Sequence, residues 1–368
     1  MRAILLAGGA GTRLRPLTYT TPKPLLPVCN QPFLERQLTW LGRFGVTDVT
    51  LALGYLADPF VTHFPGGTFG PMSLSYAVEP EALGTAGAIK FAAEQIGVGA
   101  QERIVVCNGD VLTDLDLSEL VDFHVARDAE ATISLTRVED PSRFGVVPTD
   151  SDGRVRAFVE KPPPGKAPSH WINAGTYVLE GRMLDRIPYG VNTSIERETF
   201  PKMLTQDGRL FAMESSAYWL DVGVPNQYLQ AHHDLLNGRL GDQVVPEATR
   251  DGMGPWRQGE VEAADSASFS PNCLVGGGTT VDDDAVVVMS SLGFGCKIGR
   301  GAVIRDAVLG DGVTVESGAR VEHSILGPGA IVGAGAVVQQ VSVVGASAIV
   351  PAGSTQSEAR INPPGDFE

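Results

Sequence analysis

The sequence lacks several features that would place it in other classes of protein. Its 368 residues include only four cysteines, none of them in C-x-x-C spacing. This argues against a disulfide framework or a zinc site and predicts small, buried cysteines in a reduced compartment. No apolar run approaches the roughly 18 residues that a membrane-spanning helix needs. Because only Met1 and Arg2 precede the first apolar segment, no signal peptide is expected and the cytoplasm is the predicted location.

Basic residues are scarce as well. The chain has 28 Lys and Arg against 43 Asp and Glu, so its formal net charge is −15. That balance argues against nucleic acid or an anionic membrane as the partner. If the chain binds phosphates, its positive charges must be concentrated locally, with a metal ion sharing the task. The length exceeds that of one ordinary core and predicts two domains.

What the sequence does contain is a glycine-rich turn directly after its first apolar strand, residues 3–7. Three of the four residues from Gly8 to Gly11 are glycine, so backbone N–H groups can converge on one point with no Cβ in the way. Such a turn binds phosphate, and Arg13 and Lys23 add the positive charge that phosphate oxygens need. A tight strand-to-helix turn without a ligand is the alternative. Arg15 counts least, because a solvated arginine fits its position equally well.

Strands and helices alternate after this turn. Apolar spacing predicts helices at 32–44 and 85–96 and strands at 49–53, 74–78 and 104–108. Repeated strand–helix units imply an α/β domain, residues 1–236, with a mostly parallel sheet and helices on both faces. Ligands of such sheets bind at the carboxyl ends of the strands. Asp110, at the end of VVCNGDV, is therefore a candidate metal ligand, with an Asp that caps the next turn as the alternative.

A different pattern begins after residue 270. The preceding stretch, 237–270, is rich in Gly, Pro and charge without periodicity, which predicts a linker. Aliphatic residues then recur six apart within groups of three and usually five apart between groups: Val275, Val281, Val287, Leu292, Ile298, Ile304, Leu309, Val315, Val321, Leu326, Val332, Val338, Val344 and Val350. This hexapeptide pattern predicts a left-handed parallel β-helix over 271–353, with coils one residue short at one corner. A C-terminal tail, 354–368, follows.

The glycine turn continues as G-G-x-G-T-R-L-x-P-L-T and then P-K-P-L, residues 8–25. This long pattern resembles the signature of the sugar-1-phosphate nucleotidyltransferases, which join an NTP to a sugar 1-phosphate and release pyrophosphate. The resemblance implies a Rossmann-like nucleotidyltransferase domain with a mixed, mostly parallel sheet. It also implies catalytic roles for Arg13, Lys23, Asp110 and Lys161. The nucleotide would contact the turn through Leu6, Ala7, Gly8, Gly9, Gly11, Thr12 and Arg13.

The same resemblance assigns Mg²⁺ as cofactor, held by the aspartates of a G-D and a D-x-G motif, here Asp110 and Asp221. It assigns the sugar phosphate to Gly109, Gly145, Glu160, Lys161, Asn173 and Gly175. Glu160 and Lys161 match an E-K-P motif, and Asn173 and Gly175 match an N-A-G motif. Consecutive residues of a strand point to opposite faces. A local bend must therefore turn one residue of the Glu160–Lys161 pair into the site.

Base recognition is expected within EPEALGTAGA, at Glu79, Gly84 and Thr85. Small residues would let a flat base approach the backbone. Guanine presents two adjacent donors, which the carboxylate of Glu79 could accept together; a surface Glu is the alternative. The marker S-I-E-x-E-x-F-P, residues 194–201, is most like the mannose-1-phosphate guanylyltransferases within the family. By its residues alone it predicts a helix N-terminus at Ser194 with no catalytic value.

The resemblance favours GTP and mannose 1-phosphate as substrates, and thymidylyl or adenylyl transfer to glucose 1-phosphate stays open. Two interpretations from other classes also stay open. Hexapeptide β-helices are often acyltransferases with a histidine base, and His323 is the one histidine in the repeat, where a polar corner residue fits as well. A non-catalytic regulatory subunit is disfavoured because the motif residues are intact. Packing between copies, or effector binding, is the expected role of the β-helix, and a homo-oligomer through the β-helix is predicted.

Overall fold

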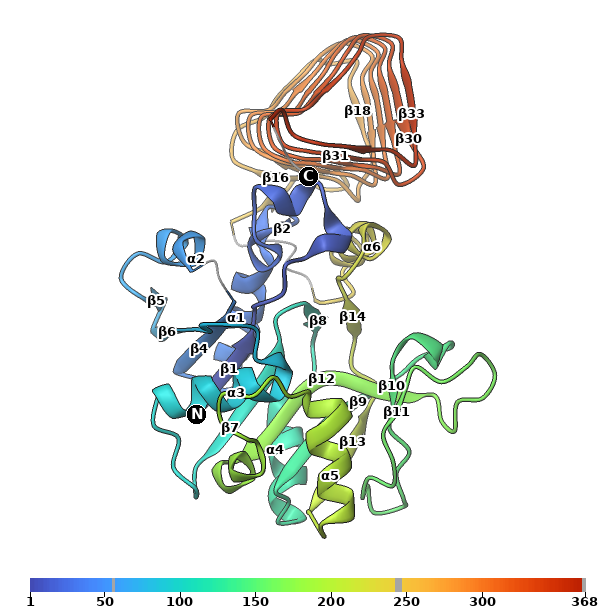
Figure 1. The fold of residues 1–368 in the computed structure, drawn as a ribbon. Coiled ribbons are helices and arrows are strands. Elements are labelled where there is room, and N and C mark those ends of the chain that lie inside the picture. The colour runs from blue at the N-terminus through green and yellow to red at the C-terminus, as the bar shows by residue number, and fades with distance from the viewer. Residues whose placement is uncertain (55–56, 242–246, 366–368) are drawn as a thin grey trace. The chain divides into compact units, whose positions relative to one another are not determined.

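The computed structural model describes residues 1–54, 57–241 and 247–365, and its fold is drawn in Figure 1. The chain forms two compact units. Unit 1 comprises Met1–Gly9 and Leu34–Trp219, and unit 2 comprises Ala10–Phe33 and Leu220–Glu368. The segment after the glycine turn thus groups with the C-terminal half of the chain, which a single boundary at residue 236 did not anticipate. Residues 242–246 of the predicted linker and 366–368 of the predicted tail lie outside the described residues.

Unit 1 contains a ten-stranded mixed sheet. Its main path runs β11 (Val159–Glu160), β10 (Gly145–Val146), β12 (Trp171–Glu180), β7 (Arg103–Asn108), β1 (Arg2–Leu6), β4 (Asp48–Leu53), β6 (Met72–Val78) and β5 (Thr68–Phe69), with β9 (Ala131–Arg137) and β13 (Leu210–Ser215) beside β12. The strands β7, β1, β4 and β6 are parallel, and β12 is antiparallel to β7. Consecutive residues of β1 and β7 are buried without alternation, so both faces of the sheet are covered. The predicted α/β class is confirmed.

Helices follow the strands as predicted. The predicted segments correspond to α1 (Phe33–Arg43) and α3 (Gly84–Gln95), and α2 (Asp58–His63), α4 (Leu117–Ala126) and α5 (Phe200–Thr205) are further helices of this part. The buried face of α3 carries Ala86, Ile89 and Ala92, and it shares one core with Tyr177 and Phe200. Short side chains on α3 let the helix approach the sheet closely. In the part of the chain that the structure describes, no helix is both long and apolar enough to cross a membrane.

Unit 2 contains a parallel β-helix, drawn in orange and red in Figure 1. Its three sheets are formed by β15 (Thr249–Arg250), β16 (Trp256–Gln258), β19 (Leu274–Gly276), β22 (Ser291–Leu292), β25 (Val308–Leu309), β28 (Ile325–Leu326), β31 (Val343–Val344) and β34 (Arg360–Ile361); by β17 (Glu262–Ala263), β20 (Thr280–Val281), β23 (Lys297–Ile298), β26 (Thr314–Val315), β29 (Ile331–Val332) and β32 (Ile349–Val350); and by β18 (Ser268–Phe269), β21 (Val286–Val288), β24 (Val303–Arg305), β27 (Arg320–Glu322), β30 (Val337–Gln339) and β33 (Thr355–Ser357). The register stacks Val275 on Leu292, Leu309 and Leu326. All the predicted aliphatic positions are buried, which confirms the repeat.

The β-helix extends further at both ends than the aliphatic repeat indicates. Strands β16, β17 and β18 form a coil inside the stretch predicted as linker, and β33 and β34 lie inside the predicted tail. The registers place Arg257 opposite Val275 and Gln356 opposite Val338. Terminal coils face neighbours on one side only, so their inward positions need not be aliphatic. Periodicity therefore could not reveal them.

The remaining elements of unit 2 lie against the β-helix. They are three short 3-10 turns (Thr12–Leu14, Leu17–Tyr19 and Lys23–Leu25), β2 (Pro27–Val28), β3 (Gln31–Pro32) and α6 (Pro225–Leu236). The side chain of Asn30 donates to the carbonyl of Leu292 (2.9 Å). On α6, the hydroxyl of Tyr228 donates to the carbonyl of Pro27, and His232 Nδ1 accepts from the backbone N–H of Cys29 (3.2 Å). These bonds tie the segment 10–33 to α6 and to the β-helix.

Candidate active site

Four parallel strands of unit 1 end at one edge of the sheet, and the first predicted site residues lie there. Leu6 pairs with Asn108 on one side and Ala52 on the other. The N–H of Gly109 donates to the carbonyl of Leu6 (2.9 Å), and a Cβ on Gly109 would lie 2.6 Å from the same oxygen. The turn that begins at Ala7 and the turn that carries Asp110 are thus neighbours because Gly109 has no side chain.

The same edge includes the predicted base-recognition loop. A Cβ on Gly8 would lie 2.9 Å from the backbone nitrogen of Gly54, directly after β4. Glu79 follows β6, and its Oε2 accepts a hydrogen bond from the backbone N–H of Leu83 (2.8 Å). Burial raises the pKa of Glu79, and the Leu83 bond partly offsets that effect. Glu79 is therefore a half-buried residue whose carboxylate bonds within its own loop.

Gly84 has a backbone conformation and a close neighbour that both disfavour a side chain. Its φ is +69°, and a Cβ there would lie 2.7 Å from the carbonyl oxygen of Thr193. The backbone of another loop therefore lies directly against Gly84. Thr85, the next residue, donates through its hydroxyl to Glu196 Oε2 (2.9 Å) and accepts from the N–H of Ile195 (2.8 Å). The opening of α3 is thus held by the segment that contains the S-I-E marker.

Two of the predicted sugar-phosphate residues, Asn173 and Gly175, lie at a bulge of β12. Its register with β9 shifts between Asn173 and Tyr177, and bulges re-aim side chains at the ends of pairing. Gly175 has φ +75°, and a Cβ there would lie 2.5 Å from Asn108 Nδ2. Asn173 Oδ1 accepts from the N–H of Gly175 (3.0 Å), and its Nδ2 donates to the hydroxyl of Tyr177 (2.7 Å). The bulge therefore lies beside the carboxyl end of β7.

The E-K-P motif contains the expected bend. Glu160 pairs with Gly145 across β10 and β11, and the next residue, Lys161, has φ +47°. A positive φ is uncommon for a residue with a side chain, and it removes Lys161 from the alternation of the strand. Glu160 Oε1 lies 3.3 Å from Arg197 Nη2 and 3.9 Å from Lys161 Nζ. Two positive charges therefore adjoin this carboxylate.

Unit 2 carries the other predicted residues. Gly11 has φ +60°, and a Cβ there would lie 3.0 Å from Thr18 Cγ2 and 3.1 Å from Lys23 Cβ. A Cβ on Gly223 would lie 2.8 Å from Arg13 Nη2 and 2.9 Å from Asp221 Oδ1. Arg13, Asp221 and Gly223 thus gather at one place. Arg15 differs from Arg13, because its guanidinium lies over the ring of Tyr19, 4.8 Å from the centroid.

Asp110 and Asp221 supply the donor chemistry that a hard divalent cation requires, since carboxylate oxygens are its preferred ligands. Within residues 1–54, 57–241 and 247–365, no group of three or more His, Cys, Asp or Glu side chains could hold a metal ion. A cation at either aspartate would accordingly take further oxygens from phosphates or water. Because Gly223 has no Cβ, Asp221 Oδ1 and Arg13 Nη2 can both lie close to its backbone, and the chemistry of the two carboxylates fits such an ion.

His323 belongs to a polar cluster at a corner of the β-helix. Its Nδ1 contacts the carboxylate of Asp306, and its Nε2 lies 3.2 Å from Asn226 Oδ1 on α6. Both ring nitrogens therefore face acceptor oxygens of the same chain. His233 of α6 contacts the same carboxylate. The cluster joins α6 to a corner of the β-helix, as a polar corner residue would.

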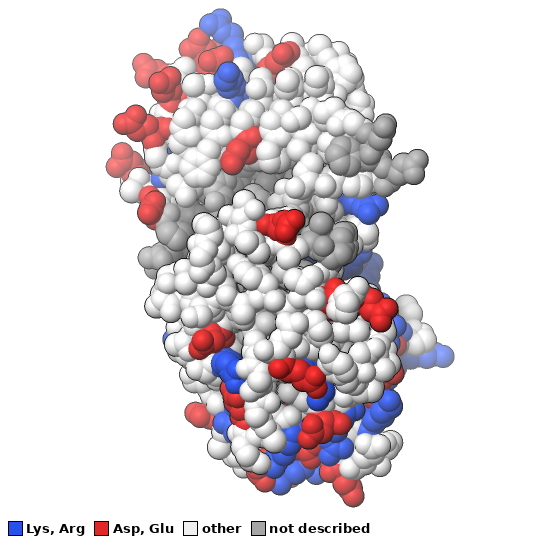
Figure 2. Space-filling model, turned by 60° about the vertical axis from the view of Figure 1, so that its left-hand side comes forward, with Lys and Arg blue, Asp and Glu red and all other residues white. Residues whose placement is uncertain are grey.

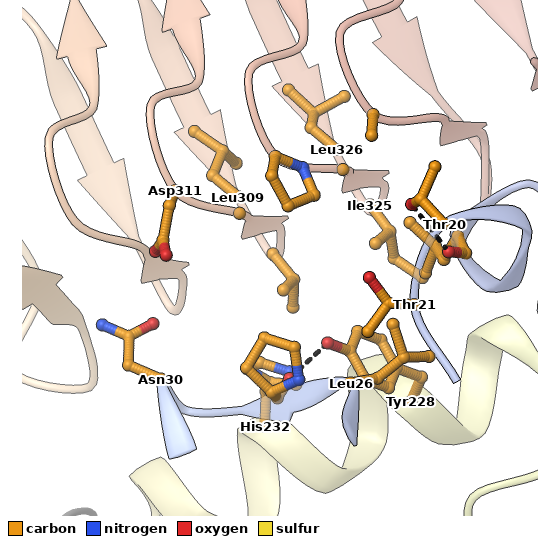
Figure 3. A pocket seen from close by; sticks show the side chains of 17 residues that line it. Thr20, Thr21, Leu26, Asn30, Tyr228, His232, Leu309, Asp311, Ile325 and Leu326 are labelled. Carbon is orange, nitrogen blue, oxygen red and sulfur yellow. Dashed lines mark hydrogen bonds between the residues drawn. The ribbon is translucent and has the colours of Figure 1, made fainter. Parts of the chain in front are cut away.

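A separate pocket in unit 2 lies between the segment 10–33, α6 and the β-helix (Figure 3). It has an empty volume of about 580 Å³ and opens to solvent. Its labelled residues in Figure 3 include Thr20, Tyr228, His232, Leu309 and Leu326. Asp311 is the one charged side chain among the lining residues, so the pocket has none of the cations that a phosphate would need.

Charge is unevenly distributed over the surface. On the face drawn in Figure 2, acidic side chains outnumber basic ones along the β-helix, whereas both signs mix over the α/β part. The three consecutive acids Asp282, Asp283 and Asp284 are exposed corner residues. Part of the net negative charge thus belongs to the β-helix, and the cations Arg13, Lys23 and Lys161 belong to the predicted motifs. All four cysteines, Cys29, Cys107, Cys273 and Cys296, are free and buried, as predicted.

Comparison with known proteins agrees with both parts of the chain. Residues 254–355 match the family described as EIF2B subunit epsilon LbH domain, which confirms the left-handed β-helix. HddC from Yersinia pseudotuberculosis is similar in structure, with a TM-score of 0.55 and 32% identity over 63% of this chain and 98% of that chain. A second structure of HddC, complexed with GMP-PN, has a TM-score of 0.54 and 31% identity over the same shares.

Sequence relatives cover most of the chain. Mannose-1-phosphate guanylyltransferase of Mycobacterium tuberculosis is 38% identical over 83% of this chain and 79% of that protein. Mannose-1-phosphate guanylyltransferase catalytic subunit beta of Danio rerio is 40% identical over 74% of each chain. Residues 2–238 match the family described as Nucleotidyl transferase, whose enzymes generally use a divalent metal ion. The chain therefore belongs to the nucleotidyl transferase family.

Proposed function

We propose that this chain transfers GMP from GTP to mannose 1-phosphate, producing GDP-mannose and pyrophosphate. The observation that carries the proposal is the edge of the unit 1 sheet, where Ala7–Gly9, Gly109–Asp110 and Glu79 follow neighbouring parallel strands. A phosphate-binding turn, a metal-binding carboxylate and an acceptor for a base are what this reaction needs side by side. Relatives of that name and the GMP-PN complex of HddC support guanine and mannose.

The protein's part in this reaction is positioning and charge neutralisation. The phosphate oxygen of mannose 1-phosphate attacks the α-phosphorus of GTP in line, and pyrophosphate leaves. The backbone of Gly8, Gly9 and Gly11 with Thr12 would hold the triphosphate. Arg13 and Lys23 would neutralise charge that develops on the leaving group. Leu6 and Ala7 would flank the nucleoside, and Gly84 and Thr85 would shape the base-binding side.

The sugar phosphate would lie along β12 and the E-K-P segment. Asn173 offers both a donor and an acceptor to sugar hydroxyls, and Glu160 accepts from them. Lys161 would hold the phosphate that attacks. The backbone groups of Gly109, Gly145 and Gly175 would line the same site.

We assign Mg²⁺ as the divalent cation, with Asp110 and Asp221 as its protein ligands. Bound there, it would neutralise phosphate charge and strengthen the electrophilic character of the α-phosphorus. We further assign the enzyme to the cytoplasm, in keeping with four buried free thiols. The β-helix, which exposes Met289 and Phe294, would join copies into a homo-oligomer.

The test is pyrophosphate release from each pairing of five NTPs with mannose 1-phosphate and glucose 1-phosphate. The proposal predicts the highest kcat/KM for GTP with mannose 1-phosphate. A preference for dTTP or ATP with glucose 1-phosphate would replace it with a thymidylyl- or adenylyltransferase. Release from no pair would overturn the proposed transfer reaction.

A further inference from the structure

One carboxylate in unit 1 receives hydrogen bonds from three hydroxyl groups on three different segments. Glu196 Oε2 accepts from Thr85 Oγ1 and from Ser194 Oγ, each at 2.9 Å, and Glu196 Oε1 accepts from the hydroxyl of Tyr177 at 3.2 Å. Hydrogen bonds to an ionised acceptor are stronger than neutral ones. The sequence predicts no more than a helix N-terminus in this segment. These hydrogen bonds hold Glu196 and its neighbours together more firmly than such a helix end requires.

The Tyr177 side of this network leads to the predicted sugar residues. Tyr177 is fully buried, and burial together with the nearby Glu196 charge raises its pKa well above the ordinary value, so its hydroxyl keeps its proton. The Tyr177 hydroxyl donates this proton in its hydrogen bond to Glu196. The oxygen of Tyr177 can therefore accept a hydrogen bond from Asn173 Nδ2 (2.7 Å). Asn173 Oδ1 then accepts from the N–H of Gly175 (3.0 Å). The orientation of the Asn173 amide is thereby determined by Tyr177.

The Thr85 side leads to the predicted nucleotide residues. Thr85 lies in the first turn of α3, directly after Gly84, and its hydroxyl both donates to Glu196 and accepts from the N–H of Ile195 (2.8 Å). The N–H groups of Ala86 and Gly87 bond to the carbonyl of Thr193 (2.9 and 3.3 Å). The start of α3 is thus attached to the segment 193–196 at several points. Glu196 is the member of that segment which also contacts Tyr177.

We infer that Glu196 is a positioning residue that couples the loop opening α3 to the β12 bulge, and so couples nucleotide binding to sugar-phosphate binding. The kinetic part of this inference rests on the proposed transfer reaction. A ligand that orders one of the two loops also orders the Glu196 carboxylate. A second ligand that orders the other loop then loses less conformational entropy. Glu196 itself need not touch either substrate. Its effect passes through Thr85 on one side and through Tyr177 and Asn173 on the other.

The kinetic test compares Glu196→Gln with Glu198→Gln. A glutamine has one acceptor oxygen and one NH₂ group, so it cannot accept on both sides. We expect Glu196→Gln to raise KM for both substrates about tenfold, the lower end of the range for residues that orient ligating groups. Glu198 Oε1 accepts from the N–H of Ser194 at the same helix end (3.1 Å), and Glu198 is exposed. Glu198→Gln is expected to leave both KM values within about twofold of the wild type.

A second variant separates the two sides. Tyr177→Phe keeps the buried ring but removes the hydroxyl, so it breaks the link to Asn173 and leaves the Thr85 bond intact. It is expected to raise KM for the sugar phosphate and not for the nucleotide. If Tyr177→Phe and Glu196→Gln both behaved like Glu198→Gln in an active enzyme, the inference would be wrong.

Hydrogen exchange provides a readout that does not need activity. In folded Glu196→Gln protein, the backbone amides of the peptide containing Gly175 should exchange several times faster than in the wild type. The hydrogen bonds described connect residue 196 to Gly175 only through Tyr177 and Asn173, so faster exchange there would report the loss of this path. Glu198→Gln should leave that peptide unchanged. Equal exchange in both variants would overturn the coupling even if no pair of substrates released pyrophosphate. Absence of release in the wild type would instead reject the proposed reaction.

Discussion

At the scale of single residues, two glycines near the same sheet edge differ in what a side chain would meet. A Cβ on Gly109 would lie 2.6 Å from the carbonyl oxygen of Leu6, whereas a Cβ on Gly9 would have nothing within 4 Å. Backbone cannot move aside as a flexible side chain can. Gly109 is therefore required by packing, and Gly9 is available to a ligand.

This difference yields a paired prediction. Gly109→Ala should lower the free energy of unfolding by about 1 to 3 kcal/mol, the usual cost of overpacking. Gly9→Ala should change it by no more than about 0.5 kcal/mol while raising KM for the nucleotide. Urea unfolding and steady-state kinetics of the two variants check this. Equal stability of both would show that β1 and β7 are less closely apposed than described.

Two arginines of the first motif give a second pair. Arg13 lies beside Asp221 and Gly223, whereas Arg15 stacks on Tyr19. Arg13→Ala should lower turnover by at least about a hundredfold, as does the loss of one charge-stabilising group elsewhere, and Asp110→Ala should do the same. Arg15→Ala should keep turnover within a few fold. The assignment of roles would fail if Arg13→Ala kept near-normal turnover in the pyrophosphate assay.

At the scale of elements, α6 is joined to a corner of the β-helix by a cluster of side chains around one carboxylate. Asp306 lies at a coil corner and contacts His233 of α6 and His323 of the next coil, and His323 also contacts Asn226 of α6. Burial disfavours the charged form of Asp306, but the hydrogen bonds and attraction from the two histidines outweigh this and lower its pKa. Arg305 and Glu322, which directly precede Asp306 and His323 in the sequence, form a further ion pair (3.9 Å).

Because the folded-state pKa of Asp306 is lowered, its stabilising contribution is present above the unfolded pKa, about 3.9, and is lost as pH falls through the folded pKa. Asp306→Asn should therefore lower the free energy of unfolding at pH 7 by about 1 to 3 kcal/mol. The difference from wild type should shrink below about pH 4. Unfolding measured across pH 3 to 8 checks this.

The control for this prediction is Asp283→Asn, which removes an exposed pair with Arg300 (2.8 Å) on the same β-helix. Exposed pairs contribute less than about 1 kcal/mol. A difference between Asp306→Asn and wild type that persisted unchanged at pH 3 would mean that the side-chain shape of Asp306, not its charge, holds α6.

At the scale of the whole molecule, the chain passes from unit 1 to unit 2 within the glycine turn, between Gly9 and Ala10. Arg13, Lys23 and Asp221 consequently belong to the unit that contains the β-helix, and Asp110 and Lys161 belong to the other. Stability of the β-helix should then matter for transfer chemistry, even though its repeat holds none of the predicted catalytic residues.

Neighbouring residues of β23 test this dependence. Ile298 is 1% exposed, and Lys297 is exposed. Ile298→Ala should cost about 3 kcal/mol of stability, and Lys297→Ala should change it by less than about 0.5 kcal/mol. In Ile298→Ala, the temperature at which transfer activity is lost should fall together with the unfolding temperature of the β-helix. In Lys297→Ala, neither temperature should change. If Ile298→Ala lost activity at the wild-type temperature, the predicted catalytic residues of unit 2 would not depend on the stability of the β-helix.

Much of the fold was predictable because it rests on local patterns. The aliphatic spacing from Val275 to Val350 predicts the β-helix, since each coil repeats one requirement for a buried side chain. The apolar segments around Ala3–Leu5 and Ile104–Cys107 predict strands buried on both faces. The first and last coils were not predictable, because Arg257 and Gln356 stand where the repeat has aliphatic residues.

Less of the candidate site followed from the sequence. The bend at Lys161 was predictable, because two consecutive functional residues cannot share a strand face. The reason for Gly84 was not, since only the folded chain brings the Thr193 carbonyl against it. Glu196 was visible merely as part of a family marker. Its three donors come from residues 85, 177 and 194, and no pattern within one segment encodes such a meeting.

Consecutive residues alone specify the two architectures, the order of the motifs and the family, because periodicity and local turn chemistry are local properties of a chain. The tertiary structure alone decided which side chains meet. It placed Ala10–Phe33 with the β-helix, set Arg13 beside Asp221, and joined Thr85 to Asn173 through Glu196 and Tyr177. Such contacts depend on how strands pair and where the chain returns, and residues far apart in the sequence carry no local sign of them.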